Sequence, residues 1–120
     1  MNYITEVKKL CSTNYDISKV DPDIVHGIIG CVTESGEMMD ALKKATFYGK
    51  EFDLVNLKEE MGDLMWYLAL LCYATNTDFK DIQAMNLQKL HARYEKKKFD
   101  EDDCEHRDLE KERSILEDSK

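Results

Sequence analysis

The sequence predicts an all-α protein that forms an antiparallel helical bundle. One proline and five glycines in 120 residues provide too few turn residues for an all-β domain. Apolar residues instead recur at helical spacing in segments that short polar stretches separate. A chain of this length, 42% of it hydrophobic, holds one domain with a modest core. We therefore expect a helical domain over residues 1–99 and a charged helix or flexible tail over residues 100–120.

The first two helices are indicated by apolar spacing and by end signals. Residues 3–11 have their apolar positions on one side of a short helix. The second helix is expected to begin at Asp21 and Pro22, because Asp caps free amides and Pro at the first position lacks the donor that would have no partner. It continues to about residue 47, and Gly49 is the expected stop.

Polar caps also mark the third and fourth helices. The third opens near Asp53 or Asn56, and Asn56 with Glu59 has the spacing of a capping box. The fourth is capped by Asp78 and is expected over residues 79–97.

The third helix contains the longest apolar stretch, residues 64–74, which is apolar on almost every side. It is shorter than the ~20 residues that span a bilayer, so no membrane association is expected. A helix that is apolar on every side needs neighbours on every side, and a chain this short can hardly provide them. We therefore expect homo-oligomerisation to complete the bundle.

Charge and cysteine content limit the partners and the compartment. Asp and Glu number 25 against 17 Lys and Arg, for a net charge of -8, which argues against binding a nucleic acid polymer. The four cysteines form no Cys-x-x-Cys pair, which fits reduced thiols. The first ten residues lack a secretory signal. These features predict a cytoplasmic protein.

Two acidic pairs are the first candidate for chemistry. Glu34 and Glu37 leave one face of the second helix, and Glu60 and Asp63 repeat this spacing on the third, with Glu59 one turn before Asp63. If the pairs converge, the carboxylates raise one another's pKa, and a hard cation such as Mg²⁺, or Mn²⁺, resolves the repulsion. The alternative is that they are ordinary charges on solvated helix faces.

A basic cluster on the fourth helix is the second candidate. Asn86, Lys89 and Arg93 follow at steps of three and four, with Tyr94 adjacent. An ammonium and a guanidinium on one face can hold phosphate oxygens. Equally, this face can pair with Glu95 or with acidic residues of the tail.

Three segments resemble the motifs of a known family. Residues 34–37 and 59–63 resemble the E-x-x-E and E-E-x-x-D motifs of the MazG-like all-α nucleoside triphosphate pyrophosphohydrolases. Residues 86–94 are similar to that family's N-x-x-K-L-x-x-R-Y segment. The resemblance extends over about residues 22–99.

The resemblance implies a MazG-like helical fold and Mg²⁺-dependent cleavage of a (deoxy)nucleoside triphosphate between the α and β phosphates. It implies four metal ligands, Glu34, Glu37, Glu60 and Asp63. It also implies four nucleotide contacts, Asn86, Lys89, Arg93 and Tyr94. Family members form dimers or dimers of dimers. The expected catalytic carboxylates are Glu37, Glu59 and Glu60, with Glu37 or Glu59 as the candidate that accepts a proton from water.

Other interpretations remain open at this point. A non-catalytic helical adaptor of the same fold would use the acidic faces to bind a protein. A relative with narrower substrate choice, such as a deoxyuridine triphosphatase or a phosphoribosyl-ATP pyrophosphatase, would share the motifs. Trp66 and Tyr67 could stack on a base, although core packing is the more common role in an apolar helix.

Overall fold

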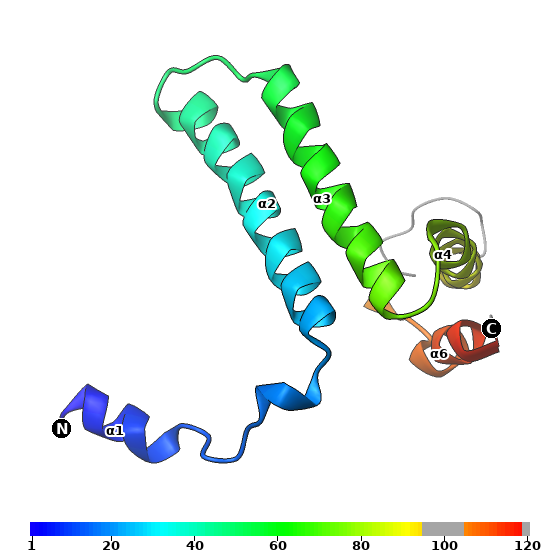
Figure 1. Ribbon diagram of the computed structural model, residues 1–120, viewed down its shortest axis with the longest axis horizontal. Coiled ribbons are helices and arrows are strands. Elements are labelled where there is room, and N and C mark those ends of the chain that lie inside the picture. Colours follow the sequence, from blue (N-terminus) through cyan, green and yellow to red (C-terminus); the bar gives the residue numbers. More distant parts are fainter. Residues whose placement is uncertain (95–104, 119–120) are drawn as a thin grey trace.

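The computed structural model describes residues 1–94 and 105–118, and in these ranges every regular element is helical (Figure 1). The elements in order are α1 (Tyr3–Leu10), the 3₁₀ turn η1 (Ile17–Lys19), α2 (Pro22–Phe47), α3 (Leu54–Ala74), α4 (Phe79–Arg93) and α6 (Leu109–Asp118). The described residues contain no strand. The all-α prediction is confirmed.

Aspartates start the main helices. The Asp21 carboxylate accepts a hydrogen bond from an amide in the first turn of α2, and Asp78 does the same for α4. At α3 the cap is Asp53, which accepts from the backbone amide of Asn56 at 3.1 Å. The predicted capping box of Asn56 and Glu59 is therefore wrong, because the chain becomes helical one turn earlier than that pair requires.

The fourth helix is shorter than predicted. It ends at Arg93, and Tyr94 leaves the helical conformation with φ -109° and ψ 77° while its amide still donates to the Leu90 carbonyl. Residues 95–97, the rest of the predicted helix, lie outside the described residues. The tail contains the helix α6, which packs on α4 (Figure 1).

The α2–α3 hairpin is the main packed unit, and two glycines set its spacing (Figure 1). A Cβ atom on Gly30 would collide with the ring of Tyr67, and one on Gly27 would lie 2.6 Å from Leu71 Cδ2. Only glycine permits this close approach. The contact between Gly30 and Tyr67 also fixes how α2 and α3 are aligned one turn before Glu34.

The hairpin lacks a closed core of its own. No apolar side chain among the described residues is buried. Large apolar side chains stay exposed along both long helices, including Ile28, Ile29, Val32, Met39, Leu42 and Met65. The helix α1 projects away from the hairpin (Figure 1). Residues 1–94 and 105–118 hold no helix with both the length and the hydropathy to cross a bilayer. Cys11, Cys31 and Cys72 are free thiols, as expected, and Cys104 lies outside the described residues.

Candidate active site

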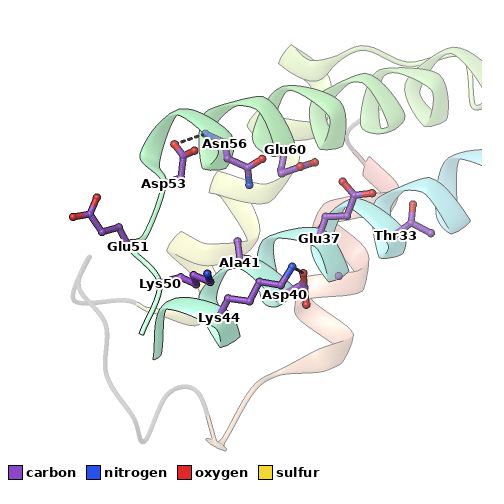
Figure 2. A pocket seen from close by; sticks show the side chains of 11 residues that line it. Thr33, Glu37, Asp40, Ala41, Lys44, Lys50, Glu51, Asp53, Asn56 and Glu60 are labelled. Atoms are coloured by element: carbon purple, nitrogen blue, oxygen red, sulfur yellow. Dashed lines mark hydrogen bonds and ion pairs between the residues drawn. The ribbon is translucent and has the colours of Figure 1, made fainter. Parts of the chain in front are cut away.

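Three of the predicted acidic residues meet between α2 and α3. Carboxylate oxygens of Glu34, Glu37 and Glu60 all lie within 4.8 Å of one another, and we call this group the carboxylate cluster. Glu34 and Glu37 come from successive turns of α2, and Glu60 comes from the facing turn of α3. Figure 2 shows Glu37 and Glu60 directed toward the same space.

The cluster is electrostatically strained without a cation. Glu60 is only 8% exposed, and its pKa is raised to about 7. The main cause is Glu37, whose carboxylate accepts a hydrogen bond from the protonated form of Glu60; burial and Glu34 add to the shift. Two of the cluster's oxygens, Glu34 Oε2 and Glu60 Oε2, are buried and have no hydrogen-bond partner.

These oxygens provide a test of whether the residues fit a metal. Buried polar atoms in folded proteins are almost always paired, so two carboxylate oxygens of one cluster without partners need an explanation. Carboxylate oxygens are the preferred ligands of Mg²⁺ and are also suited to Mn²⁺. The donor set and the missing partners therefore fit a hard divalent cation.

The other two predicted acids lie outside the cluster. Asp63 lines a neighbouring hollow together with Glu34, Trp66 and Tyr67, which we call the aromatic hollow. Glu59 is exposed, and as the residue before Glu60 it leaves α3 about 100° around the helix. Asp63 is thus next to the cluster, whereas Glu59 faces away from it.

A larger hollow, the hairpin pocket, adjoins the cluster at the turn between α2 and α3 (Figure 2). Its volume is about 710 Å³, within the usual range for small-molecule sites. Its charged and amide lining includes Glu37, Glu60, Asp40, Lys44, Lys50 and Asn56. Sequence reasoning missed the two lysines. The sequence did contain a signal for them, because they lie on either side of Gly49, at the end of the helix that carries Glu34 and Glu37.

The basic cluster of α4 lies apart from the carboxylate cluster within one chain. The start of α4 follows the Ala74 end of α3 (Figure 1), whereas Glu60 lies 14 residues before Ala74. At 1.5 Å per residue this separation is about 20 Å along the helix. Asn86 is exposed and Lys89 is half-buried. Within one chain, the basic cluster and the carboxylate cluster do not share a hollow among the described pockets.

Arg93 is engaged by the C-terminal helix. Its Nε and Nη2 atoms donate to Glu112 at 2.8 and 3.3 Å, and Arg107 donates to the same carboxylate at 2.6 and 3.4 Å. Glu112 is 4% exposed. Arg93 first and then Arg107 lower the pKa of Glu112 to about 2. The structure thus shows the pairing of Arg93 with an acidic tail residue that the sequence left open. Sequence reasoning could not single out Glu112 among the many acidic residues of the tail.

Tyr94 completes this region. Its ring lies beside the Arg93 guanidinium, with 5.8 Å from Cζ to the ring centroid. Tyr94 is half-buried, in keeping with its position where α4 ends.

Comparison with known proteins identifies the family. The family model of the MazG nucleotide pyrophosphohydrolase domain matches residues 28–98, more than half of the chain. The chain belongs to this family. The match includes the carboxylate cluster, the hairpin pocket and the basic cluster of the MazG domain, and it ends before α6. MazG proteins generally depend on a divalent metal, which agrees with the donor set of the cluster. No curated protein and no solved structure matches the chain significantly.

Proposed function

We propose that this MazG-family chain is a Mg²⁺-dependent nucleoside triphosphate pyrophosphohydrolase that converts a (deoxy)nucleoside triphosphate to the monophosphate and pyrophosphate. The carboxylate cluster carries the proposal. Three carboxylates from two helices lie within 4.8 Å, with two buried oxygens that lack partners, beside a pocket large enough for a nucleotide. Glu34, Glu37 and Glu60 would hold the metal, and Asp63 would join them from the adjacent turn of α3.

The chain's own residues have separate tasks in the reaction. A bound divalent cation would supply neutralisation of phosphate charge. Glu37 is the exposed member of the cluster and lines the hairpin pocket, so it is placed to orient a water and accept its proton. The water oxygen forms a bond to the α phosphorus while the bond from that phosphorus to the bridging oxygen breaks. The electron pair leaves with pyrophosphate, and the proton passes from the carboxylate to solvent.

Among the proposed proton acceptors, the geometry favours Glu37 over Glu59. Glu37 belongs to the cluster, whereas Glu59 is exposed and leaves α3 in another direction. Glu60 is better suited to metal ligation, because it is buried and has an oxygen that lacks a partner. We therefore propose that Glu37 accepts the proton in addition to its part in holding the metal, and that Glu60 serves in ligation.

We further propose that the functional unit is a homodimer or a dimer of dimers. A single chain leaves its large apolar side chains on α2 and α3 exposed, and burying them against a second copy would supply the missing core. The same association would allow the basic cluster of one copy to approach the carboxylate cluster of another. Asn86, Lys89, Arg93 and Tyr94 would then contact the nucleotide across the interface.

The experiment that tests the function is an assay of the full chain against the eight common ribo- and deoxyribonucleoside triphosphates, with and without Mg²⁺. Pyrophosphate is separated from orthophosphate in the products. We expect pyrophosphate and monophosphate only when metal is present, and loss of turnover in Glu37→Gln. The control is Glu51→Gln, because Glu51 lies at the rim of the hairpin pocket and points away from the cluster (Figure 2).

The result also decides between the alternatives. Turnover of a single nucleotide would identify a narrow-substrate enzyme. Orthophosphate as the product would contradict cleavage between the α and β phosphates. Absence of turnover with every nucleotide would refute the proposal and favour the helical adaptor.

A further inference from the structure

The hairpin pocket is charged differently at its two ends. Glu37 and Glu60 lie at one end, and Lys44 and Lys50 lie toward the turn between α2 and α3 (Figure 2). Lysines in this position are notable in a chain with a net charge of -8. A ligand that filled the pocket would meet carboxylates at one end and ammonium groups at the other.

The turn that follows α2 holds Lys50 at the pocket. Gly49 has φ +66°, a left-handed conformation that glycine adopts without strain. The amides of Tyr48 and Lys50 both donate to the Lys44 carbonyl, at 3.0 and 3.3 Å. The backbone of Lys50 is therefore anchored to the last turn of α2. Among the described residues its ammonium has no ion-pair partner, so its charge is available to a ligand.

Lys44 is held at the same rim by a weak pair. Its Nζ lies 2.7 Å from the Asp40 carboxylate, and both side chains are more than half exposed. The hydrogen bond to Asp40 raises the pKa of Lys44, so this side chain stays charged. Exposed pairs of this kind contribute little to stability. A phosphate group with a higher negative charge can therefore compete for Lys44.

The acidic residues of the rim leave Lys50 without a carboxylate partner among the described residues. Asp40 is already paired with Lys44. Asp53 is used as the cap of α3, where it accepts from two backbone amides. Glu51 lies at the rim and points away from the carboxylate cluster (Figure 2). Lys50 is therefore the lysine of this rim whose ammonium has no ion-pair partner among the described residues.

The hollow on the other side of the carboxylate cluster has a different character. It is lined by Trp66 and Tyr67 together with Glu34 and Asp63. Trp66 is 58% exposed, and it packs edge-on against Tyr67. Aromatic and acidic side chains without a basic group suit a nucleoside better than a polyphosphate. The two hollows thus differ in the ligand chemistry that each accepts.

We propose that Lys44 and Lys50 bind the β and γ phosphates, so that the polyphosphate chain of the substrate runs from the carboxylate cluster toward the α2–α3 turn. This inference rests on the function proposed above and specifies the direction in which the substrate lies. Pyrophosphate, which takes the electron pair of the broken bond, is then released between the two ammonium groups. The site selects ligands that carry two consecutive phosphates beyond the one that is attacked.

The test is a binding experiment on the full-length Lys50→Ala variant. Isothermal titration calorimetry with Mg²⁺ present compares three probes: a triphosphate with a non-hydrolysable α,β-imido bridge, pyrophosphate, and the corresponding monophosphate. We expect the first two to bind roughly tenfold more weakly, as for the loss of one charge-assisted hydrogen bond. The monophosphate should change by less than about twofold, because its phosphate lies at the carboxylate end. Lys44→Ala should show the same selectivity, and Lys50→Arg should restore most of the affinity.

Lys43→Ala is the matched control. Lys43 lies on the same turn of α2, is exposed and does not line the hairpin pocket, and its Nζ lies 5.8 Å from the Tyr48 ring centroid. An equal loss of affinity in Lys43→Ala, or equal weakening of all three probes by Lys50→Ala, would reduce the effect to overall charge and overturn the inference. Unchanged binding of every probe would do so as well. A wild-type chain that hydrolyses triphosphates while Lys50→Ala keeps the same KM would refute the lysine contact alone. A wild-type chain that binds no probe would refute the proposed function too.

Discussion

Removal of the Glu112 carboxylate is expected to release α6 from α4. Glu112 accepts two hydrogen bonds from Arg93, and these bonds link the two helices through this carboxylate. The Arg93 and Glu112 side chains are 12% and 5% exposed, so the pair is shielded from water. Loss of one partner from a shielded pair leaves the other charge without compensation.

The magnitude follows from the two bonds that cross between the helices. Each charge-assisted hydrogen bond contributes roughly a factor of ten to an equilibrium, so Glu112→Ala should favour opening of α6 by roughly 100-fold. The bonds from Arg107 add little to docking, because Arg107 lies in the same segment as α6 and its side chain is 38% exposed.

Amide hydrogen exchange measured by mass spectrometry on α6 detects this opening. Exchange of the α6 amides should be roughly 100-fold faster in Glu112→Ala, since exchange rates follow the population of the open form. Glu117→Ala is the control: Glu117 pairs with Arg113 on the same helix, and these side chains are 59% and 76% exposed. Equal exchange rates in the two variants would refute the reasoning that Glu112 holds α6.

The pH dependence has a definite sign. The folded-state pKa of Glu112 is about 2, below its ordinary value of 4.5. The group therefore stabilises the docked state fully above pH 4.5, and this contribution is lost as the pH falls from 4.5 toward 2. The exchange rates of wild-type α6 should approach those of Glu112→Ala over that interval.

Three further outcomes are expected. Gly30→Ala should lower the free energy of unfolding in denaturant by about 1–3 kcal/mol, because the added Cβ would collide with Tyr67. The control Gly36→Ala has open space around it and should raise the free energy of unfolding by up to about 1 kcal/mol. Equal effects of the two variants would contradict the close approach of α2 and α3. Glu34→Gln should abolish the rise in melting temperature on adding Mg²⁺, and a retained rise would remove Glu34 from the metal site. Ile29→Glu should shift sedimentation to smaller species; a wild-type chain that is already monomeric would refute oligomerisation.

Local signals predicted most of the fold. The Asp21–Pro22 pair, the Gly49 stop and the Asp78 cap act within one turn of the helix that they delimit, and all three are confirmed. At α3, two capping signals three residues apart competed. Asp53 is the cap because its carboxylate accepts hydrogen bonds from two backbone amides, which would lack this partner if Asn56 were the cap.

The candidate site was predictable only in part, because side-chain spacing on one helix does not specify the alignment of two. The i, i+3 pairs placed Glu34 with Glu37, and the alignment at Gly30 and Tyr67 determined which residue of α3 faces them. It placed Glu60 in the cluster and Asp63 beside it. Gly30 determines this alignment, but the sequence does not show that Gly30 faces the ring of Tyr67.

The carboxylate cluster and the exposed apolar side chains lie on the same two helices, so the proposed metal binding and the proposed association of chains would depend on each other. Repulsion among Glu34, Glu37 and Glu60 works against the close packing of α2 and α3, whereas a bound cation removes it. A second copy that covers the exposed apolar faces of these helices would stabilise the same packed arrangement. Two ligands that favour one conformation must strengthen each other's binding by the same factor. A cation at the cluster would therefore tighten association of the chains, and association would tighten the hold on the cation.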